Sequence, residues 1–489
     1  MNRISSDSSR APNGPFRRAF VATVATLAAL CGLFLALAYL QGPKLETAQL
    51  DTDRAISEPG QLLRIFANQS IAEVSAAQVT IEPAVPFTVS TSGEVIGVTF
   101  ASRLHYDTTY SVSVEGVTSS YSDRPATLSY SFTTGELPLY YLDRAAPAEG
   151  AVDAAGDDEI IRTGLTGTEL TGTEVTGTER TVLFAGPRIQ SFGMVTDTVV
   201  AVVSLNDDET RRLELVDTET GLVETVGLPA EGTITNFGLS DSGTILAFEF
   251  TSAESSDGGG GTAYSRALLR LDLDAGRDLE TVLGLSGAPL KVLDFTFAPA
   301  STDLVVHSID SSIVRIGVDG AIRPLGQFTR MGHLSIDDRV LTVFDQFGAL
   351  ALDLDTLETS RLEPSALDGA AADDAAPSGS DVDVLPNGER VQRVAVFHAD
   401  TGRFDSLVVL DDGTSSRVLY QTPKSEGSID GFRVSPNGQY VAVEAVPNFA
   451  KSVDDGYAVD RRSTSVQTII VDIATGAVVR IVDGFDLDW

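Results

Sequence analysis

Several residue types that carry chemistry are scarce in this sequence. Its 489 residues include one cysteine, one tryptophan and four histidines. The cysteine, Cys31, lies in an apolar segment, so the rest of the chain can form neither a disulfide nor a thiolate metal site. This lack of disulfides favours a bacterial envelope protein over a secreted eukaryotic one. The histidines stand singly, without the spacing of metal ligands: His105, His307, His333 and His398.

Positive charge is also in short supply. Lysine and arginine number 34 against 69 acidic residues, which gives a formal net charge of −35. Such a surface repels nucleic acid, because binding to nucleic acid depends on neutralising phosphates with Lys and Arg. Nucleophile-elbow, Walker and dinucleotide glycine motifs are absent from the sequence, so no catalytic residue and no cofactor is predicted. Acidic turns at 272–274 and 411–413 offer at most weak calcium binding, and acids at such places more often simply form the turn.

One long apolar run does occur, at residues 19–40, and it contains no charged residue. A helix of that length spans about 30 Å, the thickness of a bilayer core. Four arginines and one aspartate precede it, so by the positive-inside rule residues 1–18 are expected to stay in the cytoplasm. The sequence predicts a single-pass membrane protein with an extracytoplasmic body. The alternatives are a signal peptide cleaved near 36–38 and a lipoprotein modified at Cys31, where Leu30 stands in place of a small residue.

Residues 50–135 alternate apolar and polar residues with the period of β-strands. Three segments show it clearly: 95–100, 109–117 and 128–132. About seven short strands in a segment of this size suggest a β-sandwich. The segment resembles bacterial Ig-like domains at 79–83, at Leu104 followed by 109–112, and in the closing Phe-Thr-Thr at 132–134. That resemblance implies a spacer or an adhesive module, and we expect a spacer.

A short phrase, aliphatic-x-x-Phe, recurs through residues 137–489. Its clear copies begin at Ile189, Ile234, Val292, Ile429 and Val482. Weaker copies lie near His333 and Asp381. Their spacing of roughly 40 to 60 residues suits a four-stranded propeller blade. The sequence therefore predicts an all-β protein whose larger domain is a β-propeller.

The two ends of this region complement each other. Residues 484–489 form an inner-strand phrase, whereas 137–142, 159–165 and 181–184 look like the later strands of a blade that lacks its first. Pairing these fragments completes a blade, closes the ring and removes exposed sheet edges. This count gives about seven blades, with six and eight as alternatives.

The region resembles TolB-like propellers, which belong to the broad group related to WD-repeat folds. Besides the strand phrases, residues 432–438 approximate the aromatic-x-x-Ser-Pro-Asp-Gly turn of that family. The sequence departs from the family in having Phe at the aromatic position, with tryptophan only at Trp489, and in having lost most of the Pro-Asp-Gly turns. The resemblance implies the fold, without functional residues and without a Tol–Pal partner.

Two insertions, at 251–266 and 447–463, follow the second strand of their blades and are expected on one face of the disk. Long loops on a rigid scaffold often carry recognition, so this face is predicted to bind a partner. The candidate contact residues are Ser256, Asp257, Asp454, Asp455, Tyr457, Arg461 and Arg462. The alternative is a pair of tolerated surface insertions. The Thr-Gly-Thr-Glu tandem at 166–179 and the segment 368–381 are expected to be solvated loops.

These features predict a membrane-anchored propeller that serves as a platform for an envelope protein or glycan. The alternative is a propeller enzyme, a hydrolase or lyase, that acts on an envelope glycan or peptide in its central channel. Carboxylates or histidines clustered at one mouth of the channel would favour the enzyme, and a featureless channel beside a broad rim would favour the platform.

Overall fold

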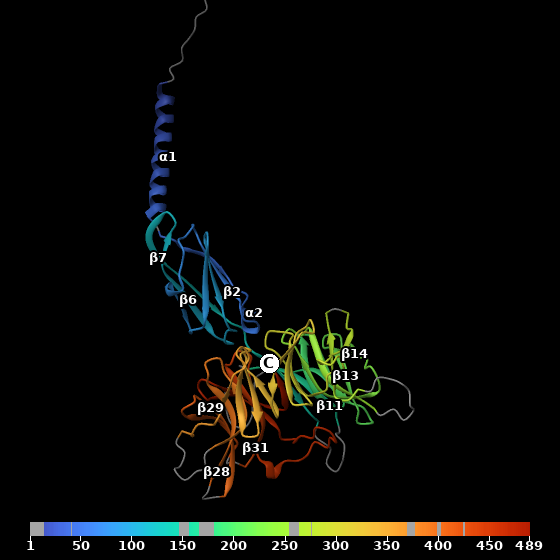
Figure 1. Ribbon diagram of the computed structural model, residues 1–489. Helices are drawn as coiled ribbons and strands as arrows, with labels where there is room; N and C mark the ends of the chain where they lie inside the picture. Colours follow the sequence, from blue (N-terminus) through green and yellow to red (C-terminus); the bar gives the residue numbers. More distant parts are fainter. Residues whose placement is uncertain are drawn as a thin grey trace, which may run out of the picture. The chain divides into compact units, whose positions relative to one another are not determined.

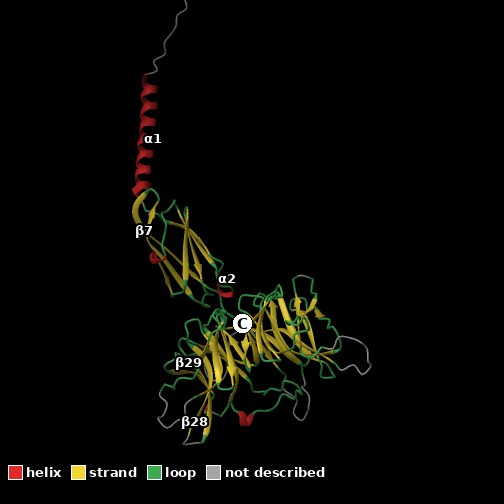
Figure 2. Ribbon diagram, in the orientation of Figure 1, coloured by secondary structure: helices red, strands yellow, loops and turns green. Residues whose placement is uncertain are grey.

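The computed structural model describes residues 14–40, 42–145, 156–165, 180–253, 264–274, 276–368, 377–398, 402–423 and 426–489, except the side chains of 14, 15, 33–40 and 403. Strands make up most of this part of the chain (Figure 2). The chain forms two compact units, Met1–Leu104 with Thr108–Thr134 and His105–Asp107 with Gly135–Trp489.

Helix α1 runs from Gly14 to Leu40 and contains the apolar segment 19–40. Long aliphatic side chains and alanine favour a helix throughout this segment. Within the described part of the chain, however, no helix meets the combined requirements of length and apolarity for crossing a membrane.

The rest of the first unit consists of two antiparallel sheets. One has the order β1-β2-β5-β4, with strands Leu45–Gln49, Leu62–Ala67, Val95–Phe100 and Phe87–Ser92. The other has the order β3-β6-β7, with strands Val79–Glu82, Thr109–Ser119 and Ser122–Thr133. Two short helices, α2 (Thr52–Ser57) and η1 (Ala76–Gln78), lie between strands in the sequence. Strand β1 begins before residue 50, the predicted start of this domain. It belongs to the sheet through its pairing with β2, although its side chains are at most half-buried.

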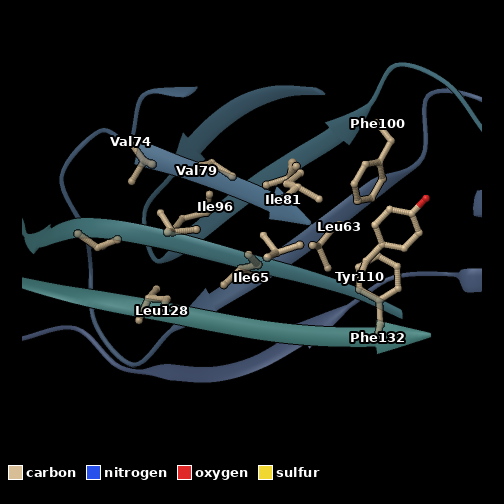
Figure 3. Packing of buried hydrophobic residues seen from close by; sticks show 14 of the residues in the cluster. Leu63, Ile65, Val74, Val79, Ile81, Ile96, Phe100, Tyr110, Leu128 and Phe132 are labelled. Atoms are coloured by element: carbon tan, nitrogen blue, oxygen red, sulfur yellow. The ribbon is translucent and has the colours of Figure 1, made fainter. Parts of the chain in front are cut away.

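One hydrophobic core joins the two sheets (Figure 3). The alternation predicted for β5 is observed, because Ile96, Val98 and Phe100 are all fully buried. From the second sheet, the ring of Phe132 lies 5.5 Å from that of Tyr110 and 6.2 Å from that of Phe100, measured between centroids. The unit is therefore a β-sandwich of two sheets that share their apolar faces.

Within the described residues, the second unit contains seven four-stranded antiparallel sheets, here called blades 1 to 7 (Figure 1). Blade 1 comprises β11 (Ile189–Thr196), β12 (Val199–Leu205), β13 (Arg211–Asp217) and β14 (Val223–Thr225). Blade 2 comprises β15 (Gly232–Leu239), β16 (Ile245–Ser252), β17 (Ala267–Asp272) and β18 (Leu279–Thr281). Blade 3 comprises β19 (Val292–Phe297), β20 (Leu304–Ser308), β21 (Ser312–Ile316) and β22 (Ile322–Gln327). Blade 4 comprises β23 (Arg330–Leu334), β24 (Val340–Asp345), β25 (Gly348–Asp353) and β26 (Thr359–Arg361).

The remaining blades follow the same plan, with one exception. Blade 5 comprises β27 (Ser378–Val384), β28 (Arg390–His398), β29 (Arg403–Asp411) and β30 (Ser416–Gln421). Blade 6 comprises β31 (Ser428–Val434), β32 (Tyr440–Val446), β33 (Gln467–Asp472) and β34 (Val478–Asp483). The exception is blade 7, which joins β8 (Pro138–Asp143), β9 (Asp158–Gly164) and β10 (Thr181–Gly186) to the C-terminal strand β35 (Phe485–Asp488).

Blade 7 confirms the closure predicted from the sequence. Its order is β10-β9-β8-β35, and β35 pairs with β8 through Phe485 and Leu142. A single residue, Gly484, carries the chain from the outer strand of blade 6 to the inner strand of blade 7. Its φ is 147°, and an added Cβ would come within 2.6 Å of the Leu142 carbonyl oxygen, so this crossing needs glycine.

Apolar clusters fill the spaces between successive blades. Blades 1 and 2, 2 and 3, 3 and 4, 4 and 5, and 5 and 6 each share one. A further cluster joins blades 6, 7 and 1 and includes Val446, Phe485 and Phe192. The ring of seven blades is therefore closed by packing as well as by strand pairing.

Candidate functional site

A cavity with a volume of about 860 Å³ lies on the axis of the propeller. Inner strands of all seven blades line it. This volume is in the range of small-molecule sites, which are usually 300 to 1,000 Å³. We call the cavity the axial channel.

One residue from each blade forms a layer around the channel, and we call this layer the channel ring. In six blades it is the residue that follows the apolar core side chain of the inner strand, namely Phe192, Phe237, Phe295, Val382, Phe432 and Phe485. In blade 4 a register shift between Met331 and Leu334 inserts one extra residue before it. The ring consists of Gly193, Gly238, Thr296, His333, Asp383, Arg433 and Asp486, and all seven line the channel.

The channel ring is asymmetric. Blades 1 to 3 contribute small residues, Gly193, Gly238 and Thr296, which we call the small arc. Blades 4 to 7 contribute four residues with ionisable side chains, which we call the ionisable arc: His333, Asp383, Arg433 and Asp486. A wall that is uncharged on one side and ionisable on the other suits a ligand that is oriented by its polar end.

In the ionisable arc, Arg433 and Asp486 are held by backbone groups. The Arg433 guanidinium donates to the carbonyl oxygen of Leu487 at 2.9 Å. Asp486 accepts from the backbone N–H of Phe192 at 3.3 Å, so it bridges blades 7 and 1. Burial raises the pKa of Asp486 to about 6, although the positive charge of Arg433 opposes this rise. This carboxyl therefore titrates just below neutral pH.

Asp383 is the least compensated carboxylate in the channel. It is only 5% exposed, and its Oδ1 has no hydrogen-bond partner. Burial raises its pKa to about 7, and only the backbone N–H of Val384 opposes the rise. A buried polar atom without a partner is costly, so an atom of this kind that lines a cavity marks a place where a ligand can bind.

His333 completes the ionisable arc. Its ring stacks on that of Phe432, with 5.4 Å between centroids and an angle of 2° between planes. Burial lowers its pKa, and Asp381 opposes this only in part. The imidazole is therefore neutral at pH 7 and adds no positive charge to the channel.

Other channel aspartates already have partners. Asp381 accepts from Arg330 at 3.0 Å and lies 2.6 Å from an Nη of Arg393. Asp294 accepts from the side-chain amide of Asn236 at 3.3 Å, and burial raises its pKa. A further aspartate, Asp488, accepts from the backbone N–H of Met194 at 2.9 Å, and burial raises its pKa as well. The position of Asp381 corrects one expectation, because the predicted loop 368–381 ends inside strand β27.

One end of the channel, where the inner strands begin, is here called the N-mouth. Both insertions leave from this end, because Ser428 pairs with Val446 in blade 6 and Gly232 pairs with Ser252 in blade 2. Gln190 also lies in the channel wall; it is 5% exposed, and neither its amide oxygen nor its amide nitrogen has a partner.

The 447–463 loop crosses the N-mouth toward blade 1. Its Asp460 forms an ion pair with Arg211, which also donates to the carbonyl oxygen of Ile234 at 3.0 Å. Asp460 and Arg462 of the loop line the channel. The loop therefore contributes to the channel wall.

Two buried contacts hold this loop in place. Asp455 pairs with Arg144 at 2.9 Å, and both side chains are almost fully buried. Tyr457 donates its hydroxyl to Asp158, a fully buried residue that also accepts from the backbone N–H of Ile189 at 2.7 Å. Burial raises the pKa of Tyr457 and that of Asp158, so the tyrosine keeps its proton.

The predicted contact residues thus have different surroundings. Asp455 and Tyr457 are buried and anchor the loop. Arg462 packs over the ring of Phe485 at 4.9 Å and faces the channel. Asp454 and Arg461 are exposed and pair with each other at 3.1 Å. Ser256 and Asp257 lie outside the described residues, as does the tandem at 166–179.

The acidic turns considered for calcium have other roles in the described residues. Asp411 is fully buried and accepts from Arg390 at 2.7 Å and from Ser365 at 2.8 Å. Asp272 accepts the backbone N–H of Asp274 within its turn. The histidine His307 is buried, with Nε2 3.1 Å from the carbonyl oxygen of Phe328, and His398 lies 3.0 Å from Asp405. Across the described ranges, no group of three His, Cys, Asp or Glu residues could hold a metal ion.

Sequence reasoning missed the channel ring, although a signal was present. Two inner strands alternate aspartate with an aliphatic residue, in Asp381-Val382-Asp383 and in Asp486-Leu487-Asp488. Val382 packs between blades 4 and 5 and Leu487 is buried, so the aspartates on the other side of these strands line the axis.

No family model matches the sequence, and no curated protein matches it either. Three solved structures illustrate the proteins that it resembles in fold. An oligogalacturonate lyase in complex with manganese has 13% identity and a TM-score of 0.39, with coverage of 81% of this chain and 98% of that one. The propeller domain of the Trilobed protease from Pyrococcus furiosus has 11% identity and a TM-score of 0.38, covering 68% and 93%. TolB from Acinetobacter baumannii has 10% identity and a TM-score of 0.31, covering 81% and 80%. Similarities this low say nothing about what this chain binds.

Proposed function

We propose that this chain is a ligand-binding β-propeller of the bacterial cell envelope that takes a small polar ligand, or a polar part of an envelope protein or glycan, into its axial channel. The observation that carries the proposal is the channel ring, with its small arc facing its ionisable arc. The unpartnered polar atoms of Gln190 and Asp383 support it, because a buried polar group without a partner destabilises the fold and a ligand in the channel would supply that partner.

The other parts of the chain fit a tethered binding protein. We propose that residues 19–40 anchor it in the membrane, with residues 1–18 in the cytoplasm, and that the sandwich is an Ig-like spacer. The basic N-terminal residues and the uncharged run that follows support this topology. A chain that lacks residues 1–40 should then move from the membrane fraction to the soluble fraction. Its continued sedimentation with membranes after an alkaline wash would contradict the anchor.

Binding fits the channel better than catalysis does. Its carboxylates are spread along the axis and over several blades, and most of them accept hydrogen bonds from backbone N–H groups or arginines. A catalytic pair needs two groups directed at one bond. A binding channel needs only polar groups that hold different parts of one ligand.

The test blocks the channel without touching its charges. Thr296 belongs to the small arc and its hydroxyl bonds only to the adjacent carbonyl of Phe297, so Thr296→Phe fills space and Thr296→Val is the matched control. Each protein is incubated with small molecules extracted from bacterial envelopes, and the retained compounds are identified by mass spectrometry. At least one compound should stay with the wild type and with Thr296→Val and be lost from Thr296→Phe. Identical profiles for all three proteins would overturn the proposal.

A second function, that of a hydrolase or lyase, is favoured by one observation. Two carboxyls of the channel ring, Asp383 and Asp486, have pKa values raised by burial to about 7 and about 6. Near neutral pH one can be protonated while the other is ionised, as general acid–base catalysis requires. If the wild type returned the retained compound in cleaved form, whereas Asp383→Asn and Asp486→Asn returned it intact, the enzyme would be the correct assignment.

A further inference from the structure

The charged groups of the axial channel are unequal in number and in partners. Six aspartates and four arginines line it, and its histidine is neutral. Three of the arginines also have acceptors within the protein, although the buried Nε of Arg211 has none. Arg433 donates to the carbonyl oxygen of Leu487, Arg330 donates to Asp381 and Ser380, and Arg211 pairs with Asp460. The channel therefore attracts positive charge and offers few free donors to an anion.

Among the aspartates, Asp383 stands apart. Asp381 and Asp460 each pair with arginine, and Asp486 and Asp488 accept backbone N–H groups of blade 1. Asp383 Oδ1 accepts nothing, although the side chain is almost completely buried. Neither arginine of the neighbouring strand β28 forms an ion pair with Asp383, since Arg390 pairs with Asp411 and Arg393 pairs with Asp381. A hydrogen-bond donor that carries positive charge would satisfy this oxygen best.

A metal ion is a poor candidate for that charge. Hard cations require several oxygen ligands that converge on one point, and no such group of acidic residues or histidines exists within the described residues. An ammonium group needs no such cage, because its three N–H donors can go to separate acceptors. The channel, with its volume of about 860 Å³, has room for the carbon skeleton that bears it.

We infer that the channel ligand carries a primary amine and that Asp383 is the carboxylate that receives this amine. The inference rests on the proposed function and names its ligand class. Gln190 adds a second requirement, since its amide oxygen and nitrogen, both unpartnered, need a donor and an acceptor from the same ligand. An amino sugar meets both requirements with its amine and hydroxyls, and a lysine side chain in a peptide meets them with its amine and amide groups.

Two matched pairs of probes separate the amine from the rest of the ligand. Glucosamine and N-acetylglucosamine differ in the charge of one nitrogen, and Nα-acetyl-lysine amide and Nα-acetyl-norleucine amide differ in having or lacking the amine. Binding of each probe to the full chain is measured by isothermal titration calorimetry at pH 8. The proteins are the wild type, Asp383→Asn, Thr296→Phe and the control Asp355→Asn, which removes one exposed charge outside the channel.

The inference expects at least one amine probe to bind the wild type and Asp355→Asn, and to bind Asp383→Asn at least tenfold more weakly. The neutral partner of that probe should not bind. The sugar pair and the lysine pair then identify the source of the amine. If probes bind and Thr296→Phe abolishes binding, but Asp383→Asn or loss of the amine changes nothing, the amine inference is wrong and the proposed function stands. If neither amine probe binds the wild type, the amine inference is wrong, and the extract experiment alone decides the proposed function.

Discussion

Phe432 and Arg433 are neighbours on strand β31, yet they have opposite surroundings. Phe432 is 7% exposed and packs in the apolar cluster between blades 5 and 6, whereas Arg433 lines the axial channel. The same contrast separates Val382 from Asp383 on β27. Between the blades, apolar side chains from both sides fill the space. Along the axis, residues of every kind stand at equivalent positions, and some have no partner.

This difference separates the requirements of the fold from those of the site. An apolar side chain between blades stabilises the ring through burial, and any residue of similar size serves the purpose. The residue that follows it lines the axial channel, so its identity can vary with the ligand. Substitutions on the two sides of one strand should therefore have opposite effects on stability, and four predictions test this contrast.

Deleting residues 484–489 should have the largest effect, because it removes both sides of the contrast together. Phe485 and Leu487 are almost fully buried, and the deletion also opens the ring between blades 6 and 7. Two large apolar side chains of this kind are worth about 5 kcal/mol or more, so the melting temperature should fall by roughly 10 °C or more. Differential scanning calorimetry measures the change.

The control for this deletion replaces the six residues with a Gly-Ser sequence of equal length, which keeps the chain but lacks the side chains. It should melt close to the deletion variant. If both variants melted like the wild type, blade 7 would not depend on β35 and the closure would be wrong.

The fold could be predicted from the sequence because its apolar pattern is periodic. The aliphatic-x-x-Phe phrase marks the inner strands at Ile234 and Ile429, and the fragments at 137–142 and 484–489 predict the closing blade. Burial between blades requires such residues at every repeat, so the requirement leaves a regular trace.

The site could not be predicted in the same way, because its members share a position without sharing a residue type. Gly193, Thr296 and Asp383 are equivalent in the ring, yet nothing in their chemistry connects them. The buried pair of Asp455 with Arg144 was equally invisible, since 311 residues separate the two partners. Long-range contacts between unlike residues leave no local pattern.

On the blade side of the contrast, Phe432→Ala should destabilise the protein by about 3 to 5 kcal/mol, because it leaves a cavity between blades 5 and 6. The matched control is Phe347→Ala, whose side chain is 77% exposed, and this change should cost less than about 0.5 kcal/mol. Denaturant unfolding followed by circular dichroism gives both values. Equal costs for the two substitutions would refute the assignment of Phe432 to the core.

The 447–463 loop contacts both the packed blades and the axial channel. The substitution Asp455→Ala tests how strongly its buried ion pair holds the loop in place. Arg144 would keep its bond to the carbonyl oxygen of Asp460 at 2.8 Å and its contact with the ring of Tyr457, so the expected loss is about 2 kcal/mol. Hydrogen exchange should rise within the loop. The control is Asp454→Ala, which removes an exposed pair and should change stability by less than about 0.5 kcal/mol. Similar exchange in both variants would mean that the buried pair does not anchor the loop.

For a residue that lines the axial channel, the expected change in stability has the opposite sign. The substitution Asp383→Asn should stabilise the protein at high pH. Burial raises the pKa of Asp383 to about 7 from an ordinary value of 3.8. The folded state therefore holds this proton more tightly than the unfolded state does, so its contribution to stability is complete below pH 3.8 and is lost as the pH rises through 7. At pH 8 the wild type carries a buried charge that the asparagine variant lacks.

The charged groups around Asp383 do not alter this sign. The raised pKa of Asp383 is due to burial, and the backbone N–H of Val384 opposes it.

Asp383→Asn should raise the free energy of unfolding by roughly 2 kcal/mol at pH 8, about half of what a three-unit shift would give, and by almost nothing at pH 4. Urea unfolding at both pH values measures the difference. The control is Asp355→Asn at an exposed position, and its free energy of unfolding should match that of the wild type at both pH values. Because the same substitution is expected to weaken amine binding, a gain in stability joined to a loss of affinity would identify Asp383 as a residue kept for a ligand. A loss of stability at pH 8 would make it a structural residue and would end the contrast between blade and axis at that position.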